Sequence, residues 1–262
     1  MPIDDSTRAG IADEAFAASL PEAVRSAFPE ALAEAASDPA LTEDLALVLL
    51  KQSDLPTQVL GRLSRNSGVM KSRKVKLALV EHPRTPRHLS IPMVRHLFTF
   101  DLMRVALTPV VPPDIKMAAE ESLINRLERL SQGERLSLAH RASGRVAATL
   151  LLDAEPRVIH AALENARLTE SAVIKALMRR NAPEAFVGAV CRHSKWSLRR
   201  EIRVALLRNA NTPLRRALEF SRSLPPALVR EILHGSHLPA STKKGLLKDL
   251  AERNGGSDES TF

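Results

Sequence analysis

The chain has very few aromatic residues. Among its 262 residues there is no Tyr, one Trp and seven Phe. Because apolar residues still make up 44% of the chain, the core must consist mainly of Leu, Ala and Val, which favours helix over sheet. Proteins that hold single-stranded nucleic acids usually stack bases on aromatic side chains. The shortage of aromatics therefore argues against a protein that binds single strands.

Cysteine and long apolar runs are also scarce. The single cysteine, Cys191, cannot form a disulfide within the chain, which suits a reducing compartment. Residues 1–10 lack the basic start and apolar core of a secretory signal. The longest largely aliphatic runs, 45–50 and 146–152, are far shorter than the roughly 20 residues that span a bilayer. We therefore expect a soluble, cytoplasmic protein with no membrane insertion.

Catalytic and cofactor motifs are missing too. There is no Gly-x-Ser-x-Gly turn, no glycine-rich nucleotide loop and no pair of histidines at the spacing of a zinc-protease helix. The groups at 191–193 (CRH) and 234–237 (HGSH) could supply metal ligands only if the fold joined them, since each alone is short of a closed site. Cys191 stands among apolar residues, which indicates a buried structural thiol. We expect no enzyme activity, no cofactor and no metal.

What the chain does have is a short repeated sequence motif that spans the end of one helix and the start of the next. We call this motif the phrase. Residues 79–86 (LVEHPRTP) and 207–213 (LRNANTP) both end in Thr-Pro. Thr can cap the following helix, and Pro can stand at its first position, where a missing N–H costs nothing. Weaker versions occur at 53–56, 111–114, 165–169, 181–184 and 237–239. The repetition predicts an all-α fold, an irregular α-solenoid of stacked antiparallel helix pairs.

Apolar periodicity places the individual helices. They are expected near 42–51, 55–65, 72–81, 86–97, 100–108, 114–130, 132–141, 143–152, 155–164, 169–180, 183–192, 197–208, 213–221, 225–234 and 240–252. Asp114 is expected to cap the 114–130 helix, and Ser131 with Glu134 has the spacing of a capping box.

The repeated phrase also suggests a repeat family. Through its pattern of helix, Asn/His-Pro/Ala-x-Thr-Pro and helix, the region 45–250 resembles HEAT-like repeats and the leucine-rich-repeat-variant type of bacterial helical repeat. The copies are unevenly spaced, which favours degenerate repeats. A stack of this kind implies function by binding on an extended surface.

Charge divides the chain into parts. Residues 1–44 hold ten acids and two arginines, a net charge of −8, so the remainder carries +16 of a whole-chain charge of +8. We expect a disordered leader at 1–10, an acidic helical segment at 11–44, a basic α-solenoid at 45–253 and a disordered tail at 254–262. The acidic segment either caps the stack or folds back on its basic surface.

The strongest local signal is a basic run over 179–230, where twelve Arg and Lys face only three acids, a net charge of +9. It is either a solvated face held by ion pairs or a ridge that binds an anionic partner. On a helix over 197–208, Arg199 and Arg203 share one face, and the next helix begins with Arg215 and Arg216. The candidate binding residues are Arg192, Lys195, Arg199, Arg200, Arg203, Arg215 and Arg216.

Trp196, just before that helix, either stacks on a nucleobase or plugs the junction between repeats, and the plug is favoured because Leu198 is close by in sequence.

These features predict a non-enzymatic interaction or scaffold protein that binds an acidic macromolecule, most simply an acidic segment of another protein. Sequence-independent binding of duplex nucleic acid is an alternative, because backbone contacts need Arg and Lys but no base-reading motif. A third is a repair enzyme similar to the HEAT-like DNA glycosylases, which need aromatic residues and a carboxylate along a concave channel. One Trp and no Tyr disfavour the glycosylase.

Overall fold

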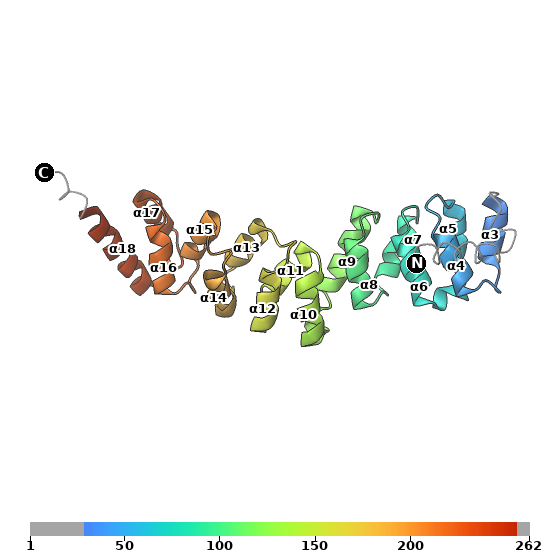
Figure 1. The fold of residues 1–262 in the computed structure, drawn as a ribbon, viewed down its shortest axis with the longest axis horizontal. Helices are drawn as coiled ribbons and strands as arrows, with labels where there is room; N and C mark the ends of the chain where they lie inside the picture. The colour runs from blue at the N-terminus through green and yellow to red at the C-terminus, as the bar shows by residue number, and fades with distance from the viewer. Residues whose placement is uncertain (1–28, 256–262) are drawn as a thin grey trace, which may run out of the picture. The chain divides into compact units, whose positions relative to one another are not determined.

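The protein is all-α in the part that the computed structural model describes, residues 29–255, where there are 16 α-helices, two 3₁₀ helices and no strand (Figure 1). The α-helices are α3 (Pro29–Ser37), α4 (Glu43–Leu50), α5 (Thr57–Arg65), α6 (Arg73–Glu81), α7 (Arg87–Val94), α8 (Thr99–Leu107), α9 (Pro113–Ile124), α10 (Gln132–Arg141), α11 (Gly144–Leu150), α12 (Pro156–Leu163), α13 (Glu170–Leu177), α14 (Glu184–Arg192), α15 (Arg200–Arg208), α16 (Leu214–Arg222), α17 (Pro226–His234) and α18 (Ala240–Gly255). The 3₁₀ helices are η1 (Val69–Lys71) and η2 (Leu127–Arg129). The predicted all-α class and the stacking of helix pairs are confirmed.

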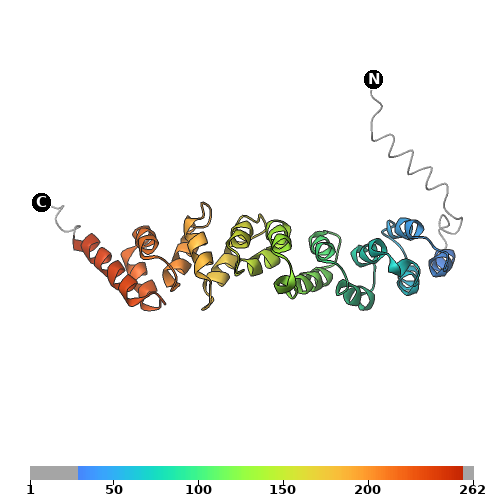
Figure 2. The ribbon, with the colours of Figure 1, turned by 90° about the horizontal axis from the view of Figure 1, so that it is seen from below.

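The chain divides into two compact units after Leu123, at the last turn of α9. In the N-terminal unit, α3 packs on α5, and α6 packs on α4, α7 and α8. In the C-terminal unit, α10, α12 and α14 follow one another in one layer, while α11, α13, α15 and α17 form a second layer (Figure 1; Figure 2 shows the same helices turned by 90°). Helix α16 contacts α15 and α18. Each unit is thus a stack in which a helix meets its neighbour and the helix two places along.

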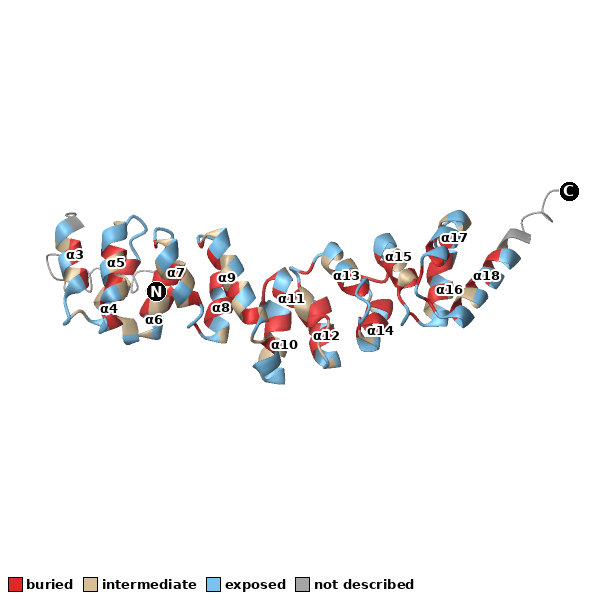
Figure 3. Ribbon diagram, turned by 180° about the vertical axis from the view of Figure 1, so that it is seen from behind, coloured by how far each residue is buried: buried red, intermediate tan, exposed pale blue. Residues whose placement is uncertain are grey.

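Each unit has its own aliphatic core, and buried residues lie along the sides of helices that face their neighbours (Figure 3). In the N-terminal unit this core includes Leu49, Leu60 and Leu79. In the C-terminal unit the largest buried side chains are Trp196, Phe186 and Phe220. Among the described residues, the buried Phe and Trp side chains therefore all lie in the C-terminal core.

The described part of the acidic segment belongs to the stack. Leu32, Ala33 and Ala36 on α3 are buried in the same core as α5, which agrees with the capping alternative for residues 29–37. The expected boundary between 44 and 45 falls inside α4. The predicted leader at 1–10 and the acidic residues 11–28 lie outside the described residues, as does the tail beyond Gly255.

Helix α9 differs from its prediction at both ends. It ends at Ile124, not at 130, and a turn leads into η2. Leu127 stands four positions after Leu123, and both are buried. The helical spacing of apolar residues therefore continues past the end of α9, so the sequence pattern does not reveal that end. Asp114 lies in the first helical turn, where it pairs with Arg87 at 2.6 Å, so its predicted capping role is wrong. The capping box of Ser131 and Glu134 is confirmed.

The predicted role of threonine in the Thr-Pro phrases is also wrong. The hydroxyls of Thr85 and Thr212 donate to the carbonyls of Leu79 and Leu206, both at 2.6 Å, and so serve the preceding helix. The prolines that follow them stand at the N-cap itself, not at the first helical residue. The last four carbonyls of a helix have no partner within it. Threonine donates a hydrogen bond to one of these carbonyls, and the proline after it starts the next helix.

A polar side chain at the start of several phrases links consecutive repeats. Asn66 donates to the carbonyl of Asp38 at 2.8 Å, and its oxygen accepts from the Gly68 amide. The same pattern recurs at Asn165, Asn209 and His82, whose side chains contact the carbonyls of Ala139, Leu177 and Gln52 respectively. At these four junctions the Asn or His therefore joins a repeat to an earlier one.

No helix between residues 29 and 255 is long and apolar enough to cross a membrane.

Candidate anion-binding surface

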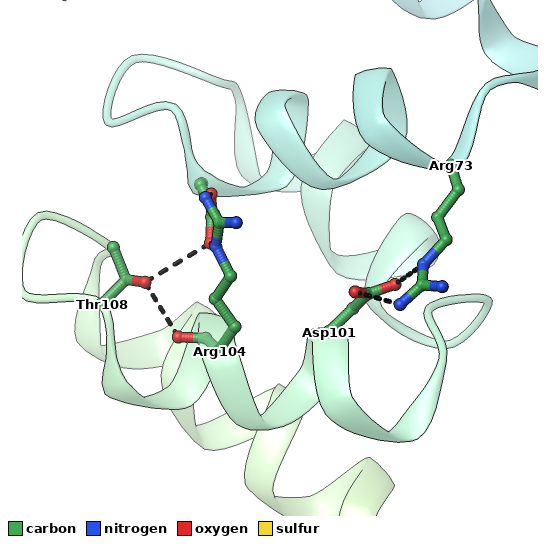
Figure 4. Close-up of polar contacts among 5 residues, drawn as sticks. Arg73, Asp101, Arg104 and Thr108 are labelled. Atoms are coloured by element: carbon green, nitrogen blue, oxygen red, sulfur yellow. Dashed lines mark hydrogen bonds and ion pairs between the residues drawn. The ribbon is translucent and has the colours of Figure 1, made fainter.

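Four of the twelve Arg and Lys between residues 29 and 123 form an ion pair with a carboxylate on another helix. Arg73 forms a two-pronged ion pair with Asp101, with N–O distances of 2.7 and 2.8 Å, and Arg104 does the same with Glu81 at 2.7 and 2.9 Å (Figure 4). Thr108 also donates to the carbonyl of Arg104. The two ion pairs join α6 to α8 at two points. These arginines are therefore already paired within the stack.

The basic run over 179–230 pairs a similar share of its Arg and Lys but holds far fewer acids, three against its twelve basic residues. Three of its twelve Arg and Lys have a carboxylate within 4 Å: Arg199 with Glu170, Arg216 with Glu219, and Arg222 with Asp249. The other nine have none among the described residues: Arg179, Arg180, Arg192, Lys195, Arg200, Arg203, Arg208, Arg215 and Arg230. Ion pairs inside the fold therefore leave most of this charge uncompensated.

Two of the predicted site residues are used inside the fold. Arg203 and Arg216 are half-buried over the Phe220 ring, with their guanidinium carbons 5.7 and 4.9 Å from the ring centre. Arg203 donates to the carbonyl of Ser197 at 2.8 Å, and Arg216 donates to that of Cys191. Their contacts are those of packing residues.

The other five predicted site residues are exposed. Helix α15 begins at Arg200, later than expected, because residues 195–198 form turns. Arg192, Lys195, Arg199 and Arg200 gather near that start, whereas Arg215 lies in the first turn of α16, after α15 has ended. The first turn of α16 also reaches the last turn of α14, because Arg216 donates to the carbonyl of Cys191, next to Arg192.

A pocket lies at the far end of α15, where three loops of the C-terminal unit meet. It has a volume of about 350 Å³ and is lined from the loops after α13, α15 and α17. We call it the arginine pocket, and its lining residues are Leu177, Met178, Arg179, Arg180, Arg208, Asn209, Ala210, Asn211 and His237.

Hydrogen bonds fix these three loops to one another. The side chain of Asn209 donates to the carbonyl of Leu177 at 2.6 Å, and that of Asn211 donates to the carbonyl of Ala182 at 2.9 Å. The backbone N–H of His237 donates to the carbonyl of Arg208 at 3.0 Å. The middle loop is therefore bonded to both of its neighbours, and the pocket is formed in advance of any ligand.

The charges of the arginine pocket have no internal partner. Arg179 and Arg180 are exposed and Arg208 is half-buried, and within residues 29–255 their side chains have no carboxylate within 4 Å. No Asp or Glu lines the pocket. Three guanidinium groups thus create a local positive potential that favours an anion. The candidate list from the sequence missed these residues, although the phrase around Asn209 marks the loop that joins them.

The residues singled out for other chemistry have structural surroundings. Trp196 is 2% exposed and its indole N–H donates to the carbonyl of Leu163 at 2.9 Å, so it plugs the repeat junction as favoured from the sequence. Cys191 is buried as predicted, and burial raises the pKa of its thiol to about 11. Among the described residues, His, Cys, Asp and Glu form no group that could hold a metal ion.

No protein-family model matches this chain, and comparison with curated proteins and with solved structures finds no match either. Function therefore has to be inferred from the chain's own residues.

Proposed function

We propose that this protein is a non-enzymatic helical-repeat protein that binds an acidic segment of a partner protein through its C-terminal unit. The observation that carries the proposal is the set of nine Arg and Lys over 179–230 that no carboxylate of residues 29–255 neutralises. Where the charge of one sign is left uncompensated, opposite charge on a partner is attracted and steered.

Exposed apolar side chains among these charges favour a peptide over a nucleic acid. Met178 is 52% exposed and lines the arginine pocket. Leu198 is 68% exposed beside Arg199. An acidic peptide with apolar residues can use both kinds of contact, whereas a phosphate backbone gains little from Met or Leu.

The spacing of the repeats suits an extended segment. Helices α13 and α15 are packed neighbours of one layer, and packed helices lie about 8–10 Å apart. An extended chain advances about 3.3–3.6 Å per residue. An acidic side chain at about every third residue would therefore meet successive loops.

The proposal includes a repeat class and a compartment. The stacked helix pairs and the Asn/His-x-x-Thr-Pro junctions support a HEAT-like class. A single cysteine that is buried and free suits the reducing cytoplasm.

The test compares ligands on the full chain. Fluorescence anisotropy would measure the Kd of a labelled peptide of alternating Glu and Leu, of the same peptide with Gln for Glu, and of a random DNA duplex. We expect the acidic peptide to bind more tightly than both others, with a Kd that rises with salt. Preferential binding of the duplex would favour the nucleic-acid alternative, and equal binding of the Glu and Gln peptides would refute the proposal.

A further inference from the structure

We infer that the arginine pocket binds a phosphoryl group carried by a phosphorylated side chain of the acidic partner segment. This inference rests on the proposed function, because it adds one specific contact to an otherwise general attraction.

The pocket holds more positive charge than one carboxylate can neutralise. Arg179, Arg180 and Arg208 contribute three positive charges, and no acid lines the pocket. A carboxylate carries one negative charge, whereas a phosphorylated side chain carries about −1.5 to −2 at neutral pH. The dianion therefore matches the pocket more closely than Asp or Glu.

The donors available also suit a phosphoryl group. Each guanidinium presents a planar fork of N–H donors that matches phosphate oxygens in pairs. Since no internal carboxylate within residues 29–255 occupies these forks, binding would not first require an ion pair to break. A phosphoryl group offers three oxygens as acceptors to the three arginines that line the pocket.

The pocket is rigid at its base. The bonds from Asn209 to Leu177, from Asn211 to Ala182 and from His237 to Arg208 hold the backbone of the three loops in place. The volume of about 350 Å³ lies at the lower end of the range for small-ligand sites, so it suits one compact group and not a long side chain. Fixed loops reduce the entropy lost when a ligand binds.

The exposed Met178 at the pocket indicates which kind of side chain stands next to the phosphorylated residue in the partner segment. Met178, exposed at the edge of the pocket, gives an apolar contact directly beside the arginines. We therefore expect the partner segment to carry an apolar side chain next to its phosphorylated residue.

The experiment uses the full chain and one labelled acidic peptide in three forms, with a central serine that is unmodified, phosphorylated or replaced by Glu. The phosphorylated form is expected to bind about tenfold or more tightly than the Glu form, since hydrogen bonds between charged groups are among the strongest. R208Q and the double variant R179Q/R180Q should lose this gain in affinity of the phosphorylated peptide over the Glu peptide. R157Q is the matched control, because Arg157 is exposed in the same unit but does not line the pocket.

A second variant guards against a loss caused by misfolding. M178E places a carboxylate beside the arginines on an exposed side chain, so it should remove the gain without lowering the melting temperature. A gain that survives in R208Q, R179Q/R180Q and M178E would overturn the inference.

The outcomes separate the inference from the proposed function. If the unmodified acidic peptide binds but phosphorylation adds no more than Glu does, the phosphoryl pocket is refuted and the proposed function stands. If only the phosphorylated peptide binds, the pocket stands and the general acidic interaction fails. Inorganic phosphate tests the source: competition at the same concentration as the phosphorylated peptide would identify free phosphate as the ligand and overturn the partner-borne assignment.

Discussion

At the scale of single residues, the phrase that repeats along the chain is a set of hydrogen bonds. Thr212 is buried and donates to the carbonyl of Leu206, and Thr85 does the same for Leu79. Asn209 in turn reaches the carbonyl of Leu177 in the previous repeat. One phrase therefore both ends a helix and fixes its position on its neighbour.

Thr212→Ala is predicted to lower the free energy of unfolding by about 1 kcal/mol, because it leaves the carbonyl of Leu206 without its side-chain donor. Thr212→Ser keeps the hydroxyl and should cost less. Urea denaturation of the three proteins measures both values. Equal stability of the Ala and Ser variants would show that the hydroxyl contributes nothing.

Cys191 gives a prediction about pH. Its pKa is raised to about 11 from an ordinary value of 9.0, chiefly by burial, although Arg216 and Arg192 oppose the shift. Between pH 9 and 11 the unfolded chain loses the thiol proton while the folded chain keeps it, so this group makes stability fall as pH rises. The folded protein should also resist alkylation by iodoacetamide.

Cys191→Ala is the control for that prediction. The variant should lose less stability than the native protein over the same pH interval, as measured by thermal melting. Parallel curves for the two proteins would count against a buried protonated thiol.

At the scale of helices, arginines of the basic run have two kinds of role, which the sequence does not distinguish. Arg203 and Arg216 lie over the Phe220 ring and donate to carbonyls, whereas Arg200 and Arg215 are exposed and have no carboxylate within 4 Å in the described part of the chain. The first pair joins α15 to α16. The second pair is free to meet a partner.

R203Q/R216Q is therefore predicted to destabilise the protein by about 1–3 kcal/mol, through lost hydrogen bonds and cation–aromatic contacts. R200Q/R215Q removes the same charge but should stay within about 0.5 kcal/mol of the native protein, as exposed substitutions do. Melting curves of the two double variants test this directly. Equal losses of stability would contradict the division into packing and surface arginines.

Helix positions could be predicted from periodicity because each helix buries one apolar face. The end of α9 could not, since Leu127 continues the apolar spacing of Leu123 beyond the helix itself. The sequence also did not show which helix the hydroxyls of Thr85 and Thr212 bond to, because a hydroxyl next to Pro can bond to the helix before it or to the helix after it. Local sequence does not say which carbonyl lies within reach.

At the scale of the molecule, the repeated phrase predicted the all-α stack, and the residue counts predicted the excess of basic charge. Neither predicted the arginine pocket, whose three loops are separated by more than twenty residues in sequence and meet only because α13, α15 and α17 lie in one layer. The division after Leu123 was not indicated either, because it falls inside a regular helix. Long-range packing decides both features.

The central claim is that uncompensated arginines of the C-terminal unit bind an acidic segment. The most direct test measures the Kd of the labelled Glu/Leu peptide for the native protein and for the quadruple variant R180Q/R200Q/R208Q/R215Q, with R157Q as control. We predict that the quadruple variant binds at least about tenfold more weakly with an unchanged melting temperature, because each lost ion pair contributes a fraction of a kcal/mol or more. An unchanged Kd in a folded quadruple variant would contradict the claim.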